Sequence, residues 1–160
     1  MTNDVELLGA AIDLALSARE QGNHPFGSLL ADADGKILLM AENTVTTESD
    51  VTGHAETNLV RLASQTFSRE ALTEMSLYTS TEPCAMCAGA IYWSGIRRVV
   101  FALAESELAA MTGNDPGNPT LSLPCREVFA AGQHSIEVLG PYEIPAARSV
   151  HDGFWTGGAQ

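Results

Sequence analysis

Apolar positions in the first part of the chain follow two different periods. Between residues 4 and 21 they recur at helical spacing, which predicts an amphipathic helix ending at Gly22-Asn23. The residues at this spacing are Val5, Leu8, Ile12, Ala15 and Leu16. Residues 26–31 and 36–41 then predict two strands, and the Asp32-Ala33-Asp34-Gly35 segment between them is typical of a hairpin turn.

The remaining chain predicts strands and helices that alternate. Further strands are expected at residues 75–80, 98–103 and 135–139. Helices are expected at residues 54–66, 84–93, 105–111, 124–131 and 146–155. Polar stretches rich in turn-forming residues predict loops at 43–52 and 112–119. This order predicts an α/β fold, a three-layer α/β/α sandwich with a mixed five-stranded sheet, in a single domain over residues 1–160.

Size and composition bound the class of protein. A chain of 160 residues that is 45% hydrophobic fits one globular domain, and no apolar run approaches the length of a membrane span. Residues Met1 to Glu6 are polar and acidic and lack the basic start of a signal peptide. Three cysteines, two of them in one C-x-x-C, favour a reducing compartment over a disulfide framework. We therefore expect a cytoplasmic protein without a membrane partner.

The charge balance is strongly acidic. The chain has 20 Asp and Glu against 8 Lys and Arg, a net charge of −12, and its densest basic pair is Arg97 with Arg98. Proteins that bind nucleic acid need positive charge against the phosphates. The sequence therefore favours a small-molecule substrate over a nucleic acid.

Two short motifs carry the candidate chemistry. His54-Ala55-Glu56 and Pro83-Cys84-Ala85-Met86-Cys87 both fall at predicted helix starts, where partial positive charge favours thiolates and other anions. One imidazole and two thiolates select Zn²⁺ over hard cations. Three protein ligands leave one position for water, as in catalytic rather than structural zinc sites. Glu56 lies two residues after His54, close enough to exchange a proton with that water.

Three other interpretations compete with a catalytic zinc. The Cys84-x-x-Cys87 pair, after a strand and opening a helix, also resembles a redox pair. A structural zinc would need a fourth ligand, for which Cys125, His24 or His134 are candidates. The four residues could also occur together by chance, with no metal. The combined pattern favours the catalytic zinc, because each half of the motif alone would be a weak signal.

At these motifs the chain resembles the cytidine-deaminase-like superfamily, and within it bacterial guanine deaminase and related nucleobase deaminases. The likeness extends over roughly half the chain, from His24-Pro25-Phe26-Gly27 to Arg98-Val99-Val100-Phe101. The stretches between these limits that carry it are Asn43-Thr44-Val45-Thr46-Thr47, Thr52-Gly53-His54-Ala55-Glu56, Leu77-Tyr78-Thr79-Ser80, Glu82-Pro83-Cys84 and Gly89-Ala90-Ile91-Tyr92-Trp93.

The resemblance implies a hydrolytic deamination. His54, Cys84 and Cys87 would hold zinc, and a zinc-activated water would attack the ring carbon that bears the amino group. Glu56 would be the catalytic residue, carrying a proton first to a ring nitrogen and then to the departing amine.

The resemblance also implies substrate contacts. Asn43 matches an asparagine that hydrogen-bonds the base, although Asn is also common in loops. Phe26 resembles an aromatic wall of the pocket or, alternatively, a core phenylalanine. The backbone N–H of Ala55 resembles a further base contact. Asp115 lies where similar guanine deaminases carry an acidic pair, and it could accept from a guanine edge or act as a turn residue.

The expected substrate is a nucleobase or nucleoside, with a purine such as guanine favoured. The alternatives are a tRNA-adenosine deaminase, a deaminase of cytosine, a nucleoside or another amino-heterocycle such as a pterin or triazine, and an inactive binding module. Residues 116–160 depart from the guanine deaminases, so Phe154 and Trp155 could cover the pocket or anchor the last helix. Because relatives form dimers, we expect a homodimer, for which the apolar Ile91-Tyr92-Trp93 segment is a candidate interface.

Overall fold

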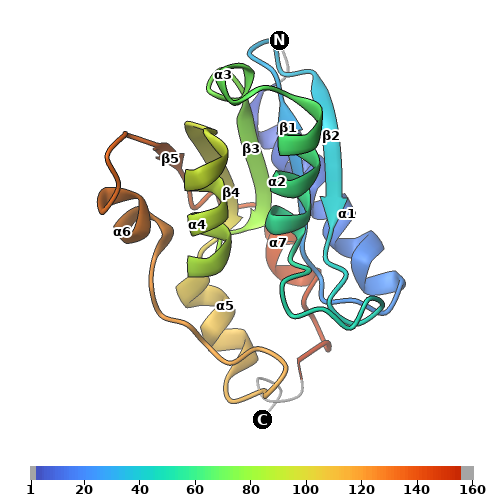
Figure 1. Cartoon of the computed structure of the whole chain (residues 1–160). Helices are drawn as coiled ribbons and strands as arrows, with labels where there is room; N and C mark the ends of the chain where they lie inside the picture. The colour runs from blue at the N-terminus through green and yellow to red at the C-terminus, as the bar shows by residue number, and fades with distance from the viewer. Residues whose placement is uncertain (1–2, 156–160) are drawn as a thin grey trace.

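The computed structural model describes residues 3–155; residues 1, 2 and 156–160 of the expected domain lie outside the described part. Its centre is a five-stranded sheet in the order β2-β1-β3-β4-β5 (Figure 1). Strand β1 runs antiparallel to β2 and β3, while β3, β4 and β5 are parallel to one another. The mixed sheet expected from the sequence is thereby confirmed. The strands are β1 (Gly27–Ala31), β2 (Ile37–Glu42), β3 (Ser76–Thr81), β4 (Arg98–Leu103) and β5 (Glu137–Leu139).

Helices cover both faces of this sheet. Helices α1 and α7 contact one face, α2 lies against the other beside α4, and α6 packs against α4 (Figure 1). Within residues 3–155 no helix combines the length and apolar character needed to cross a membrane. The helices are α1 (Asp4–Glu20), α2 (Ala55–Thr66), α3 (Arg69–Leu72), α4 (Ala85–Ser94), α5 (Glu105–Thr112), α6 (Cys125–Ala130) and α7 (Pro145–Ser149).

Two apolar cores, one on each side of the sheet, confirm the three-layer arrangement. On one side Leu59 of α2 and Ile91 of α4 pack against strand residues that include Phe101. On the other side Leu8 of α1 and Ala147 of α7 pack against the opposite face of the same strands. Strands β1 and β3 are buried along their whole length, so neither follows the alternation of apolar and polar residues that a half-exposed strand shows.

Two glycines occupy positions that a larger residue would not tolerate, Gly27 because of its close neighbours and Gly95 because of its backbone conformation. A Cβ at Gly27 would lie 2.5 Å from the Ala11 carbonyl oxygen and from Leu14 Cβ, so glycine lets β1 approach α1 closely. Gly95 has a φ of 97° and ends α4 in the left-handed conformation. Gly27 thus sets how closely β1 and α1 pack, and Gly95 sets the end of the helix that begins at the Cys84 motif.

The sequence-based elements differ from the structure in three places. Helix α3, which begins after the capping side chain of Ser68, was not expected. The predicted helix over 146–155 is wrong beyond Ser149, since the chain turns from there and Gly153 has a φ of 71°. Strand β5 has only three residues rather than the five predicted over 135–139.

A polar cluster fastens the start of α1 to the sheet. The carboxylate of Asp4 accepts hydrogen bonds from the Tyr78 hydroxyl at 2.6 Å, from Arg98 at 2.9 Å and from the Tyr142 hydroxyl at 3.3 Å. Partial burial of Asp4 opposes its ionisation, but the hydrogen bonds from Tyr78 and Arg98 outweigh it and lower the pKa of the carboxyl group. The cluster therefore links α1 with β3, β4 and the segment after β5.

We expect Asp4→Ala to lower the free energy of unfolding at pH 7 by about 1–3 kcal/mol, because it leaves partly buried donors unpaired. A carboxyl group whose pKa is depressed by folding stabilises the protein above its unfolded pKa and loses that effect as pH falls through its folded pKa. The difference in the free energy of unfolding between Asp4→Ala and the wild type should therefore shrink below about pH 4. Urea titrations over a pH series measure it, with the exposed Glu6→Ala of the same helix turn as control. An equal effect of both substitutions would show that only helix-end charge matters.

Candidate metal centre and active site

The two sequence motifs meet at the starts of two neighbouring helices. His54 is the N-cap residue of α2, Cys84 is the N-cap residue of α4, and Cys87 lies in the first turn of α4. The Nδ1 atom of His54 is 3.5 Å from the sulfur of Cys84 and 3.5 Å from that of Cys87. All three potential ligand atoms lie within 4.8 Å of one another. The fold therefore brings together the three predicted metal ligands.

The three side chains fit a bound zinc ion. A hydrogen bond from the Cys87 thiol, followed by one with His54, lowers the pKa of Cys84 to about 4. The hydrogen bond to Cys84 raises the pKa of the His54 imidazole. The imidazole nitrogen of His54 and the sulfur atoms of Cys84 and Cys87 are thus linked to one another by hydrogen bonds. A cation that prefers thiolate and imidazole ligands can take the place of the protons in these hydrogen bonds, and zinc is that cation.

Glu56 stands beside the three ligands in the first turn of α2. Its side chain is only 6% exposed but still lines the cavity described below. Burial, followed by the nearby Cys84 sulfur, raises the pKa of this carboxyl group to about 7. A carboxyl group with such a pKa can both accept and donate a proton near neutral pH. The position and the electrostatics of Glu56 therefore suit a general acid–base role.

A cavity of about 410 Å³ opens in front of these residues. His54, Glu56 and Cys84 form one side, and the loop after β2 contributes Val45 and Val51. Residues 116–119 form another wall, and His24 also lines the cavity. Volume and lining are typical of a small-molecule site with a few polar groups among apolar ones.

Two acidic residues near the cavity were not singled out from the sequence. The Glu82 carboxylate accepts hydrogen bonds from the backbone N–H of Glu105 at 3.0 Å and of Cys125 at 3.1 Å, so it fastens the first residues of α5 and α6. Glu105 lines the cavity, and its burial, together with the sulfur of Cys84, raises its pKa to about 7. In the sequence, the position of Glu82 next to Pro83-Cys84 was the signal that could have identified this residue.

Two of the predicted base contacts, Asn43 and Ala55, are buried and are not among the residues that line the cavity. Asn43 is 1% exposed, and its side-chain oxygen accepts the backbone N–H of Val45 at 3.1 Å, which is the loop-forming use of asparagine. Ala55 is the first residue of α2, so its backbone N–H is among those with no partner inside the helix. Their contacts with a base stay predictions.

The other two predicted contacts lie at the cavity wall. Phe26 lines the cavity and stands edge-on to His151, with the ring centres 5.3 Å apart. Asp115 is 9% exposed, and its Oδ1 accepts the backbone N–H of Gly117 at 2.7 Å, so it shapes the loop that walls the cavity. Asp115 thus occupies the turn position that was the alternative interpretation, and a contact with substrate stays a prediction.

The aromatic residues near the end of the described chain pack behind the cavity wall. Trp155 donates from Nε1 to Nδ1 of His151 at 3.0 Å and stands edge-on to His24 at 5.1 Å. Phe154 also stands edge-on to His24 at 5.8 Å. Since His24 and Phe26 line the cavity, this segment supports its wall from outside.

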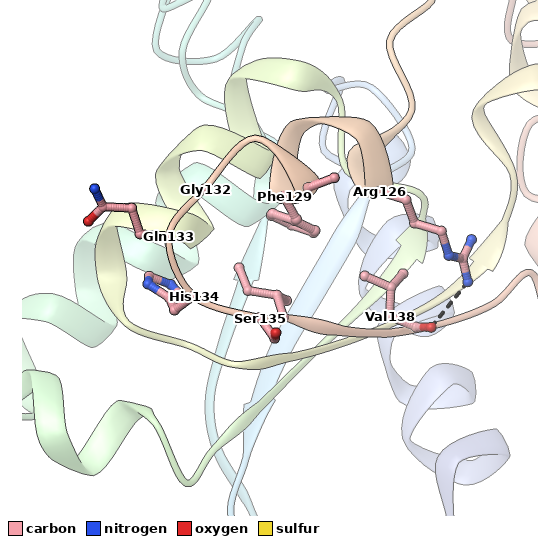
Figure 2. A pocket seen from close by; sticks show the side chains of 9 residues that line it. Arg126, Phe129, Gly132, Gln133, His134, Ser135 and Val138 are labelled. Carbon is pink, nitrogen blue, oxygen red and sulfur yellow. Dashed lines mark hydrogen bonds between the residues drawn. The ribbon is translucent and has the colours of Figure 1, made fainter.

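A second hollow, of about 380 Å³, lies beside α6 and the edge strand β5 (Figure 2). Its Arg126 donates to the carbonyl oxygens of Val138 at 3.1 Å and Gly140 at 2.9 Å, so the guanidinium group holds the chain in place. His134 stacks on Tyr92 with ring centres 4.4 Å apart. The metal-ligand cluster lies in the other cavity, which is therefore the candidate active site.

Known proteins resemble this chain in sequence and in fold. Residues 1–103 match the family described as the cytidine and deoxycytidylate deaminase zinc-binding region. The chain is 44% identical over 155 residues to a probable cytosine deaminase of Schizosaccharomyces pombe, covering 97% of this chain and 94% of that protein. It is 40% identical over 114 residues to a guanine deaminase of Bacillus subtilis, covering 71% and 72%. A solved structure from a study of tRNA:A34 deaminases superposes with a TM-score of 0.71 and 26% identity, covering 91% and 99% of the two chains.

We expect the purified protein to hold about one zinc ion per chain, because three converging donors form a site of this type. Cys84→Ser and Cys87→Ser should each lose most of it, since a hydroxyl group is a far poorer zinc ligand than a thiolate. Elemental analysis by mass spectrometry measures the metal content. Cys125→Ala is the control, because Cys125 is the remaining cysteine and is also buried. This variant should keep its zinc. Loss of zinc in that control as well would argue against the assigned ligands.

Proposed function

The chain belongs to the family of zinc-binding cytidine and deoxycytidylate deaminases, and we propose that it deaminates a free nucleobase, with cytosine as the first candidate. The enzymes of this family are aminohydrolases that cleave a C–N bond with water. The observation that carries the proposal is the extent of the likeness to the probable cytosine deaminase, 44% identity over 97% of this chain.

This extent matters because the last third of the chain shapes the cavity. Residues 116–119 and Leu121 line it, and Trp155 packs behind the wall formed by His24 and Phe26. A match over 97% of the chain includes most of these residues, whereas the match to the Bacillus subtilis guanine deaminase spans 71%. The longer likeness to the probable cytosine deaminase, which takes in the wall formed by the last third of the chain, therefore supports cytosine as the first candidate.

The residues of the site divide the reaction between them. Zinc held by His54, Cys84 and Cys87 would supply the acidity that makes a water molecule nucleophilic at neutral pH. Glu56 would take one proton from that water as its oxygen bonds to the ring carbon, and would deliver this proton to the ring nitrogen. Glu56 would then carry the second proton, from the new hydroxyl group, to the amine, so that the C–N bond breaks, ammonia leaves and a carbonyl group remains. Burial raises the pKa of Glu56 to about 7, which suits a carboxyl group that accepts and releases a proton twice. Phe26 and the apolar residues of the cavity hold a flat ring and limit access of bulk water.

Guanine, the substrate favoured by the sequence, is the second candidate. The 40% identity to a guanine deaminase favours it, and a cavity of about 410 Å³ has room for a purine. A tRNA substrate is disfavoured by the net charge of −12, because phosphate binding needs positive charge.

We also propose a homodimer of single-domain chains. Trp93, in the segment expected to form an interface, is 72% exposed on α4. An aromatic side chain of this size on the surface favours a contact with a second copy. Sedimentation analysis of the wild-type protein and of Trp93→Glu tests the proposal, since the substitution should yield monomers.

We expect the wild-type protein to release ammonia from cytosine with a kcat/KM at least about 10-fold above that for guanine, adenine, cytidine and tRNA. The reason is that the likeness to the probable cytosine deaminase extends over the last third of the chain, which forms part of the cavity wall. Coupled assays of ammonia release across this panel measure it. A preference for guanine would replace the substrate while keeping the chemistry, and no release from any compound would refute the proposed function.

We expect Glu56→Gln to lower kcat by about 10²–10⁴-fold or more, because the amide cannot carry the proton between water and the leaving amine. Zinc content should stay at the wild-type level, since Glu56 is not among the three converging ligands. Steady-state kinetics combined with elemental analysis measure both. Glu107→Gln, the same chemical change at an exposed position of α5, should leave the kinetics unchanged. Full activity in Glu56→Gln would exclude the role given to this carboxyl group.

A further inference from the structure

One buried hydroxyl group at the cavity has no partner within the protein. Thr81 is 3% exposed, and its Oγ1 makes no hydrogen bond with any of residues 3–155. The same residue lines the cavity that contains His54, Glu56 and Cys84. A buried hydroxyl group without a partner costs free energy, so its presence beside a cavity points to a partner that enters from outside.

The neighbouring hydroxyl groups of β3 are satisfied within the fold. Thr79 Oγ1 donates to the Gly27 carbonyl oxygen at 3.4 Å, and Ser80 Oγ accepts the Gly27 backbone N–H at 3.2 Å. Thr81 is thus the exception among three successive hydroxyl-bearing residues, and it is the one that lines the cavity. The difference follows from its place at the end of the strand, where β1 no longer runs alongside it.

The backbone of Thr81 is held firmly. Thr81 is paired with Leu103 in the parallel ladder of β3 and β4, and the next backbone N–H, that of Glu82, donates to the Leu103 carbonyl oxygen at 2.7 Å. The Glu82 side chain is bound in turn to the first residues of α5 and α6. Because threonine is branched at Cβ, few side-chain rotamers are open to it. A hydroxyl group fixed in this way is suited to recognise one edge of a rigid ligand.

We propose that the hydroxyl group of Thr81 hydrogen-bonds a polar atom of the substrate ring and thereby contributes to the choice of nucleobase. This inference rests on the proposed function and adds a specificity-determining residue to it. The carboxyl end of β3 lies next to that of the parallel strand β4, which is the place where ligands bind in open α/β sheets. Thr81 acts there on the ring, while Glu56 acts on the protons of the reaction.

Substitutions that separate the hydroxyl group from the volume of the side chain test this role. Thr81→Val keeps the shape but removes the hydroxyl group, and Thr81→Ser keeps the hydroxyl group but removes the methyl group. Ser28→Ala is the matched control, because Ser28 Oγ is also buried without a hydrogen-bond partner in the described chain but lies outside the cavity lining, on β1. For each protein kcat, KM, zinc content, Tm and the rise in Tm caused by saturating nucleobase are measured.

We expect Thr81→Val to lower kcat/KM for the preferred base by about 10-fold, mainly through KM, because one hydrogen bond to the bound ring is lost. Its zinc content should match the wild type, and its Tm without ligand should be equal or higher, since the hydroxyl group is buried without a partner in the free protein. Thr81→Ser and Ser28→Ala should stay within about 3-fold of wild type. Kinetics of Thr81→Val that equal those of the wild type, an equal loss in Thr81→Ser, or loss of zinc in Thr81→Val would each overturn the proposal.

A failure of the proposed function can be distinguished from a failure of the role proposed for Thr81. If the wild-type protein releases ammonia from no base, the rise in Tm caused by cytosine or guanine decides the role of Thr81. A rise that is present in wild type and reduced in Thr81→Val supports the contact. An equal rise in both proteins, or none in either, refutes it.

Discussion

The site requires that two helices begin side by side, and the packing of α2 against α4 provides this. His54 caps one helix and Cys84 the other, so a shift of either helix along its axis would separate the imidazole from the sulfur atoms now 3.5 Å away. Leu59 and Ile91, buried completely in one core, fix the relative height of the helices. Packed interiors resist such shifts because they tolerate few voids or overlaps. The chemistry of the cavity therefore depends on apolar residues that never contact it.

This dependence explains which parts of the molecule can be predicted from the sequence. The ligands and Glu56 lie in short motifs at helix starts, so local spacing and residue chemistry identify them. The mixed sheet follows from the hairpin and the alternation of elements. By contrast, the dual hydrogen bonding of Glu82 and the unpaired hydroxyl group of Thr81 arise from strand neighbours and chain segments distant in sequence. Apart from the position of Glu82 next to Pro83-Cys84, no local pattern marks these residues.

The loop after β2 and the region after β4 show the same limit. Asp115 and Asn43 each satisfy a backbone N–H of their own loop, a use that sequence alone could not separate from a contact with substrate. The last helix ends earlier than its apolar pattern indicated, because residues beyond Ser149 turn so that Trp155 reaches His24. Tertiary contacts of this kind override local propensity. The segments that shape the wall of the cavity are thus the part least accessible to prediction.

The two hydrogen bonds of the Glu82 carboxylate affect how such a protein can evolve. One side chain, adjacent to the metal-binding segment, holds the first residues of both α5 and α6. The segment from the start of α5 to the start of α6, which includes cavity-lining residues 116–119, is consequently held at both ends. Insertions, deletions or exchanges within that stretch can remodel the wall without disturbing the reactive centre. New substrates can accordingly be acquired by replacing a tethered loop while the inherited chemistry is retained.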